Sequence, residues 1–436
     1  MNPNFLTDGG GLSLYSYPTE QFKAGLLSLS VLTPVREREG MLASLLFSVL
    51  RRGCKSYPTL DALNRRLDYL YGTELSLRSY ARGDRLVTGV VLELLDGAYL
   101  PGGDADLMED TLAVVRELLF CPLTDEEGLL LARYVESEKE HMCNRIRARK
   151  SHPSAYAVHR CRALLYENDP TGVLYRVTEE DVASVTPTEL TAFYRRFLKE
   201  MHLRCFYVGP KPAKEVLDVL HRHFGDCVKG ERQALPASVT PPPLPTPRRV
   251  DETLPVTQGH LVLAFSTATT VNDPLFFACK VFNEMLGGSP VSRYFLEVRE
   301  RRGLCYSCSS SYDSYKGVIF AVCGLENSAR KEAEAAMLEQ LQALACGDFS
   351  DEELAMAKQS LQNIYRQTED NPGSIENFYF SRAEADALLS AEECSRRTAG
   401  VTREEVLRVA ERISLNVAYF LEGTLAGEEE ACDEED

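Results

Sequence analysis

Three short segments in the first half of this chain recur in the same order in the second half, and this internal repeat constrains the fold more than any other feature. The spacing between copies drifts slowly, as insertions in surface loops allow. In one pair each copy holds a threonine followed three residues later by a glutamate, the pattern of a capping box, so helix-start chemistry alone can produce that match. Three ordered matches are better explained by duplication. The pairs are 123–127 (LTDEE) with 349–353 (FSDEE), 185–190 (VTPTEL) with 401–406 (VTREEV), and 205–209 (CFYVG) with 419–423 (YFLEG).

A proline-rich segment, residues 236–249 (PASVTPPPLPTPRR), separates the two halves. Proline removes backbone donors and favours extended conformations, so this segment is predicted to be a semi-rigid linker. We therefore predict one half at 1–235, a similar half at 250–426 and an acidic tail at 427–436. Each half mixes strands with helices of a dozen or more residues, which predicts an α+β fold with helices layered on a mostly antiparallel sheet. The predicted strands include 25–33, 86–94, 260–266 and 317–323.

The composition excludes several classes of protein. A net charge of −17 argues against binding to nucleic acid or to anionic membrane surfaces. The sequence contains no run of eighteen apolar residues, so no transmembrane helix is predicted. The first residues lack the pattern of a secretory signal. The 13 cysteines are odd in number and several lie among apolar neighbours, which predicts buried thiols in a reducing, cytoplasmic compartment.

Residues 292–312 (SRYFLEVRERRGLCYSCSSSY) contain the most informative local pattern. Apolar residues at helical spacing precede Gly303, and a small, partly alternating run that suits a strand begins at Cys305. This pattern places Arg299 on a helix and Tyr306 at the start of a strand. A guanidinium and a phenol can both donate hydrogen bonds to a carbonyl and line a groove that holds an extended peptide. The alternative is a plain helix–strand turn with solvated arginines and a core tyrosine.

The pattern SR-x-F-x-E-x-R-E-x-R-G-L-x-Y-S in this segment resembles the C-terminal half of the pitrilysin/insulinase (M16) metallopeptidase family. In that family the Arg and the Tyr hold the substrate backbone near the metal, and the resemblance implies the same role for Arg299 and Tyr306. It also implies two similar halves, each an α/β roll, that form a clamshell of the M16/LuxS-like metallohydrolase type. Other stretches, 151–172 and 178–209 among them, also resemble the family.

The family's catalytic helix corresponds to residues 39–53 (EGMLASLLFSVLRRG), which form a good amphipathic pattern. In the family this helix carries H-x-x-E-H, where two histidines four residues apart bind Zn²⁺ and the glutamate acts as general base. Aligned on the glycine after the helix, those positions hold Ser44, Phe47 and Ser48. The position of the family's third ligand falls on Arg145, a permanent cation. The zinc site is therefore predicted to be lost.

No other cluster in the sequence predicts a metal, a cofactor or a nucleophile. His221 and His223 are two residues apart and diverge around a helix, and Glu138 with His141 is a single i, i+3 pair. Cys305 and Cys308 form one C-x-x-C without a second pair, so small core residues are favoured over redox or metal use. No G-x-S-x-G or P-loop is present.

Two functions from different classes follow. The first is a catalytically inactive M16 subunit that binds peptide or unfolded protein in the clamshell and pairs with an active, H-x-x-E-H-bearing M16 partner, to whose metallopeptidase site it adds Arg299 and Tyr306. The second is a stand-alone peptide- or protein-binding scaffold or accessory factor. The subgroup labelled as associated with the aminopentanol modification of elongation factor P has this general look. An active peptidase with a displaced site is a third, less favoured alternative.

Overall fold

The computed structural model describes residues 3–7, 11–100, 107–228, 235 and 237–425, so Pro236 and the predicted tail lie outside the described residues. The chain forms two compact units, and each is assembled from three separate stretches of sequence. Unit 1 comprises Met1–Ile146, Arg176–Val239 and Tyr365–Glu393, and unit 2 comprises Arg147–Tyr175, Thr240–Ile364 and Cys394–Asp436. Each half of the sequence therefore contributes one segment to the unit formed mainly by the other half.

The sheet of unit 1 has six strands in the order β1-β2-β6-β3-β5-β4. Strands β2 and β6 are parallel and the other neighbours are antiparallel. Apolar runs form the central strands because both faces of the sheet are covered. The strands are β1 (Asn4–Thr7), β2 (Leu12–Pro18), β3 (Ala24–Pro34), β4 (Glu74–Arg82), β5 (Arg85–Leu95) and β6 (Leu203–Gly209).

The sheet of unit 2 has five strands in the order β7-β11-β8-β10-β9. Here β7 and β11 are parallel and the other neighbours are antiparallel. Without β1, the sheet of unit 1 has the order β2-β6-β3-β5-β4. When the five strands of each sheet are numbered along the chain, both sheets therefore have the same order, 1-5-2-4-3, as the predicted duplication requires. The strands are β7 (Arg248–Leu254), β8 (Gly259–Ser266), β9 (Ser307–Asp313), β10 (Val318–Leu325) and β11 (Ser414–Gly423).

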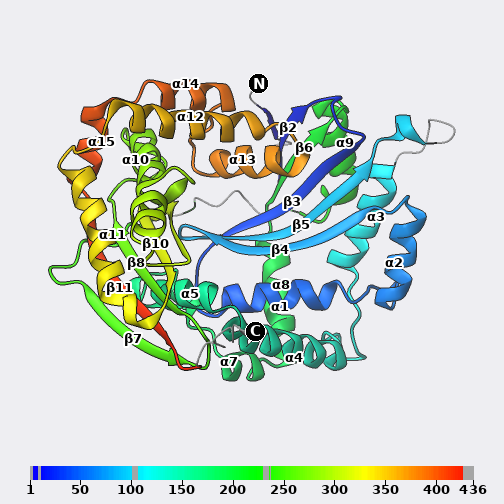
Figure 1. Ribbon diagram of the computed structural model, residues 1–436. Helices are drawn as coiled ribbons and strands as arrows, with labels where there is room; N and C mark the ends of the chain where they lie inside the picture. The colour runs from blue at the N-terminus through cyan, green and yellow to red at the C-terminus, as the bar shows by residue number, and fades with distance from the viewer. Residues whose placement is uncertain (1–2, 8–10, 101–106, 229–234, 236, 426–436) are drawn as a thin grey trace, which may run out of the picture. The chain divides into compact units, whose positions relative to one another are not determined.

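The helices of unit 1 cover its sheet, and α13 is the helix that comes from the second half of the sequence. In Figure 1 α13, in orange, lies beside the blue and green strands of this unit. Its Ile375, Tyr379 and Phe380 are fully buried in one core cluster with Phe206 and Val208 of β6. The helices are η1 (Gly97–Tyr99), α1 (Glu39–Leu50), α2 (Leu60–Tyr69), α3 (Leu107–Phe120), α4 (Ala132–Ala148), α7 (Glu179–Ala183), α8 (Pro187–Glu200), α9 (Ala213–Phe224) and α13 (Pro372–Glu384).

In unit 2 the contributed helix is α5, from the first half of the sequence. It packs on β8, β10 and β11 through Ala157 and Cys161, which share a buried cluster with Phe320 and Tyr419 (Figure 1). The helices are η2 (Arg149–Ser151), α5 (Pro153–Leu165), α6 (Gly172–Tyr175), α10 (Phe276–Asn283), η3 (Glu284–Gly288), η4 (Tyr294–Arg301), η5 (Asn327–Ala329), α11 (Arg330–Ala345), α12 (Asp351–Gln367), α14 (Ala391–Ala399) and α15 (Arg403–Ala410).

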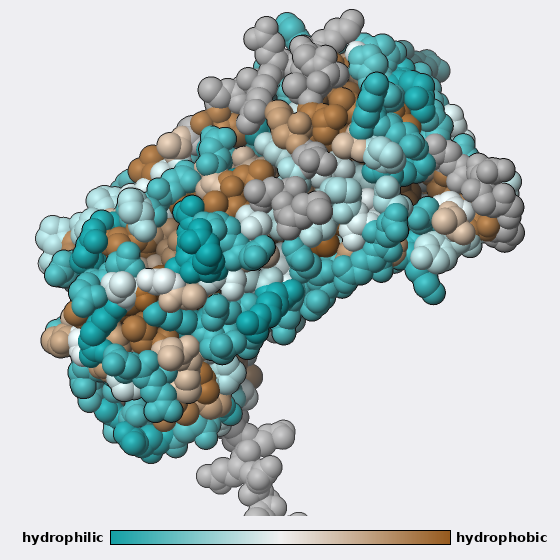
Figure 2. Space-filling model, turned by 90° about the horizontal axis from the view of Figure 1, so that it is seen from above, coloured by the Kyte–Doolittle hydropathy of each residue, from teal (hydrophilic) through white to brown (hydrophobic). Residues whose placement is uncertain are grey.

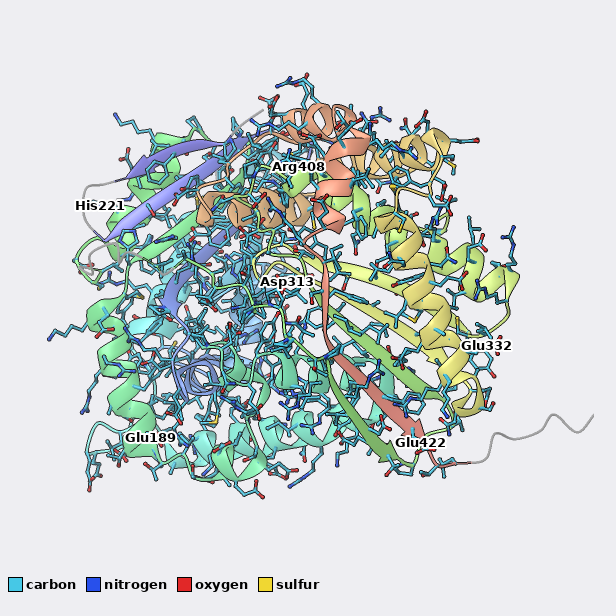
Figure 3. All side chains as sticks on the ribbon, turned by 90° about the vertical axis from the view of Figure 1, so that its left-hand side faces the viewer. Glu189, His221, Asp313, Glu332, Arg408 and Glu422 are labelled. Atoms are coloured by element: carbon cyan, nitrogen blue, oxygen red, sulfur yellow. The ribbon has the colours of Figure 1, made fainter. Side chains whose placement is uncertain are left out.

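The repeated segments mark equivalent places in the two units. Thr186 and Thr402 are both N-caps, of α8 and α15, and both helices lead into the last strand of their sheets. The capping box predicted at both sites is complete only at Thr402. At Thr186 the hydroxyl accepts from the backbone N–H of Glu189, but the Glu189 carboxylate, labelled in Figure 3, instead binds Arg38 at 3.3 Å.

The α+β class with mostly antiparallel sheets is confirmed, and the four strands predicted from apolar patterns are β3, β5, β8 and β10. Strand β7 begins at Arg248, inside the segment predicted as linker. Hydrophilic residues dominate the face of the molecule in Figure 2, with hydrophobic residues scattered among them. Within the described part of the chain, no helix is long and apolar enough to cross a membrane.

Candidate functional site

The segment that carries Arg299 is a π-helix. η4 follows a shorter π-helix, η3, and replaces the predicted α-helical ending. Tyr294 and Val298 are fully buried and fix its inner face. Gly303 ends it with φ of 62°, a left-handed backbone that glycine adopts without strain. π-Helical turns are rare and occur frequently at functional sites, because the extra residue per turn redirects side chains.

Arg299 projects from η4 into a partly exposed position. Its side chain is 38% exposed, its guanidinium lies 4.7 Å from the centre of the Phe295 ring, and it pairs with the carboxylate of Glu300 at 3.4 Å. An exposed pair of adjacent residues contributes little stability. The ring therefore orients the guanidinium while leaving it accessible to a ligand.

Tyr306 immediately precedes β9, and its side chain is 54% exposed. Its backbone N–H donates to the carbonyl of Gly324 at 2.8 Å, and its hydroxyl donates to Glu326. That hydrogen bond and the Glu326 charge raise the pKa of Tyr306, so the phenol stays protonated with its one O–H donated to Glu326. The alternative interpretation of Tyr306 as a core residue is wrong.

Both residues adjoin β9, which is one of the two edge strands of its sheet. Ser307, Ser309 and Ser311 point to the exposed side of β9, while Cys308 and Ser310 are buried. The strand ends at Asp313, labelled in Figure 3, whose carboxylate accepts from the backbone N–H groups of Tyr315 and Lys316 and so closes the turn to β10. An edge strand has one row of backbone groups without a strand partner.

A third cysteine joins the C-x-x-C pair in this region. The sulfur atoms of Cys305, Cys308 and Cys323 all lie within 4.8 Å of one another, and Cys308 is directly opposite Cys323 in the β9–β10 ladder. Hydrogen bonds from Cys308 and Cys323, and then the charge of Arg299, lower the pKa of Cys305 to about 4, whereas that of Cys308 is raised. The sequence does not show this cluster, because Cys323 is distant along the chain and only the register of a hairpin would have revealed it.

The positions aligned with the zinc motif lie on α1 in unit 1 and do not fit a metal. Phe47 is only 4% exposed, and its ring packs edge-on against Phe197 with centroids 5.7 Å apart. Ser44 and Ser48 are half-buried, and the Ser48 hydroxyl donates to the Ser44 carbonyl at 3.0 Å, within the helix. A phenyl ring and two weakly ligating hydroxyls cannot replace two imidazoles and a carboxylate.

Arg145, the position aligned with the third ligand, is exposed near the end of α4. The α4 side chain that approaches the end of α1 is instead Glu138, which is buried and lies 3.5 Å from Arg52. The sequence pattern pairs Glu138 only with His141. The Glu138 carboxylate is therefore paired with Arg52, and this ion pair is a structural contact between α4 and the end of α1.

A small pocket, partly open to solvent, adjoins the N-terminal half of α1. It is lined by apolar and hydroxyl side chains of β3 and β5, by Ala43, and by Phe193 and Phe197 of α8. At its polar side Arg196 binds Glu39 at 2.6 Å. Because β5 and α8 are distant in sequence from β3 and α1, no local pattern predicts the pocket.

Comparison with known proteins agrees with this fold and this altered site. The sequence model of the family described as "Peptidase M16 inactive domain" matches residues 184–361. The chain is 30% identical over 417 residues, 95% of its length and 96% of the relative's, to "Probable inactive metalloprotease YmfF" of Bacillus subtilis (strain 168). It is 26% identical over 322 residues, 72% of this chain and 71% of the relative, to an uncharacterised zinc protease of Mycobacterium bovis.

Solved structures show the same fold. A conserved protein from Enterococcus faecalis V583 superposes with a TM-score of 0.88 at 24% identity, covering 98% of this chain and 100% of that one. A peptidase M16 inactive domain from Pseudomonas fluorescens has a TM-score of 0.79 at 18% identity, with the same coverage. The chain belongs to the M16 peptidase family and is one of its non-catalytic members.

Proposed function

We propose that this chain is a peptide-binding M16 subunit, in which unit 2 holds an extended peptide along the edge of β9 with the help of Arg299 and Tyr306. The observation that carries the proposal is the placement of two accessible polar side chains, a guanidinium donor and a phenol, beside an edge strand. A peptide that adds to a sheet edge gains main-chain hydrogen bonds, and side chains at the strand's start then select its register.

The chemistry of the two side chains suits this role. A guanidinium held over a ring donates to backbone carbonyls, and the phenol oxygen, whose one hydrogen is donated to Glu326, accepts from a peptide N–H. The exposed serines of β9 add small polar groups that do not block a second strand. Because the chain carries a net charge of −17, basic peptides are the expected ligands.

The proposal extends to a partner. A chain that keeps the Arg–Tyr pair but carries Ser44, Phe47 and Ser48 in place of the zinc motif is suited to complete the site of an H-x-x-E-H-bearing M16 protein. Arg299 then stabilises the developing oxyanion or the substrate backbone in the partner's site. Such an obligate interface should bury on the order of 2,000 Å² or more.

Fluorescence anisotropy with a labelled, unstructured, lysine-rich peptide long enough to span β9 tests the binding. Arg299→Ala and Tyr306→Phe should each weaken binding by about 10- to 100-fold, because the first removes a donor to a peptide carbonyl and the second removes the oxygen that accepts from a peptide N–H. Arg301→Ala is the matched control: Arg301 lies two residues away, is 75% exposed and pairs with Glu297. It should change binding by less than about threefold. Equal effects of Arg299→Ala and Arg301→Ala would contradict the proposal.

The partner is tested in the same series by adding a purified H-x-x-E-H-bearing M16 protein and measuring peptide cleavage. Stimulation by the natural chain, reduced about 10²- to 10³-fold in kcat/KM by Arg299→Ala, supports the shared site. Peptide binding without any stimulation supports the second candidate, a stand-alone scaffold, which the exposed edge of β9 favours because strand addition needs no partner.

A further inference from the structure

The three cysteines at the start of β9 and β10 have the arrangement of a metal-ligand set. Cys305, Cys308 and Cys323 are free thiols whose sulfurs lie within 4.8 Å of one another. Three sulfurs bound to one zinc ion at about 2.3 Å are about 3.8 Å apart in tetrahedral geometry. Small side-chain rotations therefore bring all three onto one ion without moving the backbone.

We propose that Cys305, Cys308 and Cys323 bind a single thiophilic metal ion, Zn²⁺ or Cu⁺. Thiolates are the ligands that select these soft ions. Cys308 and Cys323 stand opposite each other on a hydrogen-bonded ladder, so two of the three ligands are rigidly placed. Cys305 comes from the turn after Gly303 and is only half-buried, which leaves its outer side open for a fourth ligand such as water.

The neighbouring Tyr294 supplies an independent indication. Its side chain is fully buried, and its hydroxyl has no hydrogen-bond partner among the described residues. It interacts electrostatically with Cys308 and Cys323. A thiol is a weak acceptor, whereas a metal-bound thiolate carries the negative charge that a phenol donor needs. A bound ion thus explains a buried donor that the thiol form leaves unused.

The charge balance also suits a metal. Three thiolates around a divalent or monovalent ion leave a net negative charge, and the guanidinium of Arg299 acts on Cys305 from η4. This site is distinct from the sequence positions of the family's zinc motif, which lie on α1 in unit 1. It also stands independently of peptide binding, because metal uptake is measured without any peptide.

The experiment uses the full, untagged chain, reduced with a phosphine under argon and stripped of metal. Zn²⁺ is titrated against a chromophoric chelator, Cu⁺ is titrated in a second arm, and Co²⁺ is used to detect sulfur-to-metal charge-transfer bands. We expect one ion per chain and, with cobalt, thiolate bands. Cys323→Ser should weaken binding by at least about 100-fold and remove the bands. Tyr294→Phe should weaken binding less, by about tenfold, while leaving the bands.

Two controls keep the result specific. Cys346→Ser removes an exposed thiol of the same unit and should leave uptake unchanged, as should Cys432→Ser in the acidic C-terminal segment. If Cys323→Ser does not fold by circular dichroism, Cys305→Ser, at a half-buried position, carries the same test. Three outcomes would overturn the proposal. The natural chain takes up neither zinc nor copper, the cluster variants take up metal as the natural chain does, or two of the three cysteines form a disulfide that persists after phosphine treatment.

Discussion

The two units differ in how a helix from the other half of the sequence packs on the sheet. In each, a helix from the other half of the sequence covers the sheet, α13 in unit 1 and α5 in unit 2. Helix α13 buries ion pairs: Arg78 and Glu376 lie 2.7 Å apart with side chains only 11% and 8% exposed. The corresponding pair of α5, Arg160 with Glu252 at 2.9 Å, lies at the margin with side chains 39% and 28% exposed.

The difference shows what each interface requires from its sequence. Glu376 accepts hydrogen bonds from both Ser28 and Arg78, so the buried charges of unit 1 depend on one another. The centre of the α5 interface is apolar, with Ala157 and Cys161 packed on the sheet. Non-directional apolar packing tolerates change, whereas a buried charge that loses its partner is costly. We therefore expect the α13 interface to be more sensitive to single polar substitutions than the α5 interface.

The largest expected effect comes from breaking the buried pair of unit 1. Glu376→Ala should lower the free energy of unfolding by about 3–5 kcal/mol, because Arg78 is left buried without its carboxylate. Chemical denaturation followed by circular dichroism measures the change, and hydrogen exchange assigns it to unit 1. The double variant Arg78→Met with Glu376→Leu should recover most of the loss.

The matched substitution in unit 2 is Arg160→Ala. It should cost less than about 1 kcal/mol, because the pair with Glu252 is solvent-screened. Equal losses for Glu376→Ala and Arg160→Ala would show that the two interfaces do not differ in the way described.

A second, intermediate effect concerns acid. Burial, and then the charge of Arg149, lower the pKa of His159 on α5 from 6.5 to about 4. Between these values the unfolded chain binds a proton that the folded chain does not, so stability falls as the pH drops from 6.5 towards 4. The loss should reach about 1–2 kcal/mol after solvent screening is allowed for. His159→Phe should flatten this dependence in urea midpoints measured between pH 7 and pH 5.

Helix α13 provides the comparison for this prediction, because it contains no histidine. The α5 interface should therefore loosen before the α13 interface over this range of pH, as hydrogen exchange would report. An unchanged slope in the His159→Phe variant would contradict the assignment of the effect to this residue.

The smallest effect distinguishes two buried tyrosines. The hydroxyl of Tyr166 in unit 2 is buried without a hydrogen-bond partner among the described residues, so Tyr166→Phe should leave stability unchanged or raise it by up to about 1 kcal/mol. The hydroxyl of Tyr379 in unit 1 accepts from the backbone N–H of Ala391, and Tyr379→Phe should lower stability by about 1 kcal/mol. Thermal unfolding of the two variants side by side measures both, and a loss at Tyr166 would imply a bound water or another partner.

Local patterns predicted much of the fold and part of the candidate site. The predicted strands at 25–33 and 260–266 match β3 (Ala24–Pro34) and β8 (Gly259–Ser266), because apolar runs bounded by turns depend only on neighbouring residues. The same holds for the start of β9 near Tyr306. The sequence predicts a helix at Arg299 but not a π-helix. The wider hydrogen-bond spacing that distinguishes a π-helix from an α-helix depends on tertiary packing and not on a local residue pattern.

The sequence by itself determined the internal repeat, the replacement of the zinc-motif residues on α1, and the retention of Arg299 and Tyr306. Each of these depends on the residue types and their spacing along the chain. Only the tertiary structure decided that α5 and α13 each pack in the unit formed mainly by the other half of the sequence. It alone also decided that Glu376 pairs with Arg78 and that Cys323 lies beside Cys305 and Cys308. An amphipathic pattern shows that a helix has a face to bury, but which sheet receives that face, and which side chains meet there, depends on contacts between residues far apart in sequence.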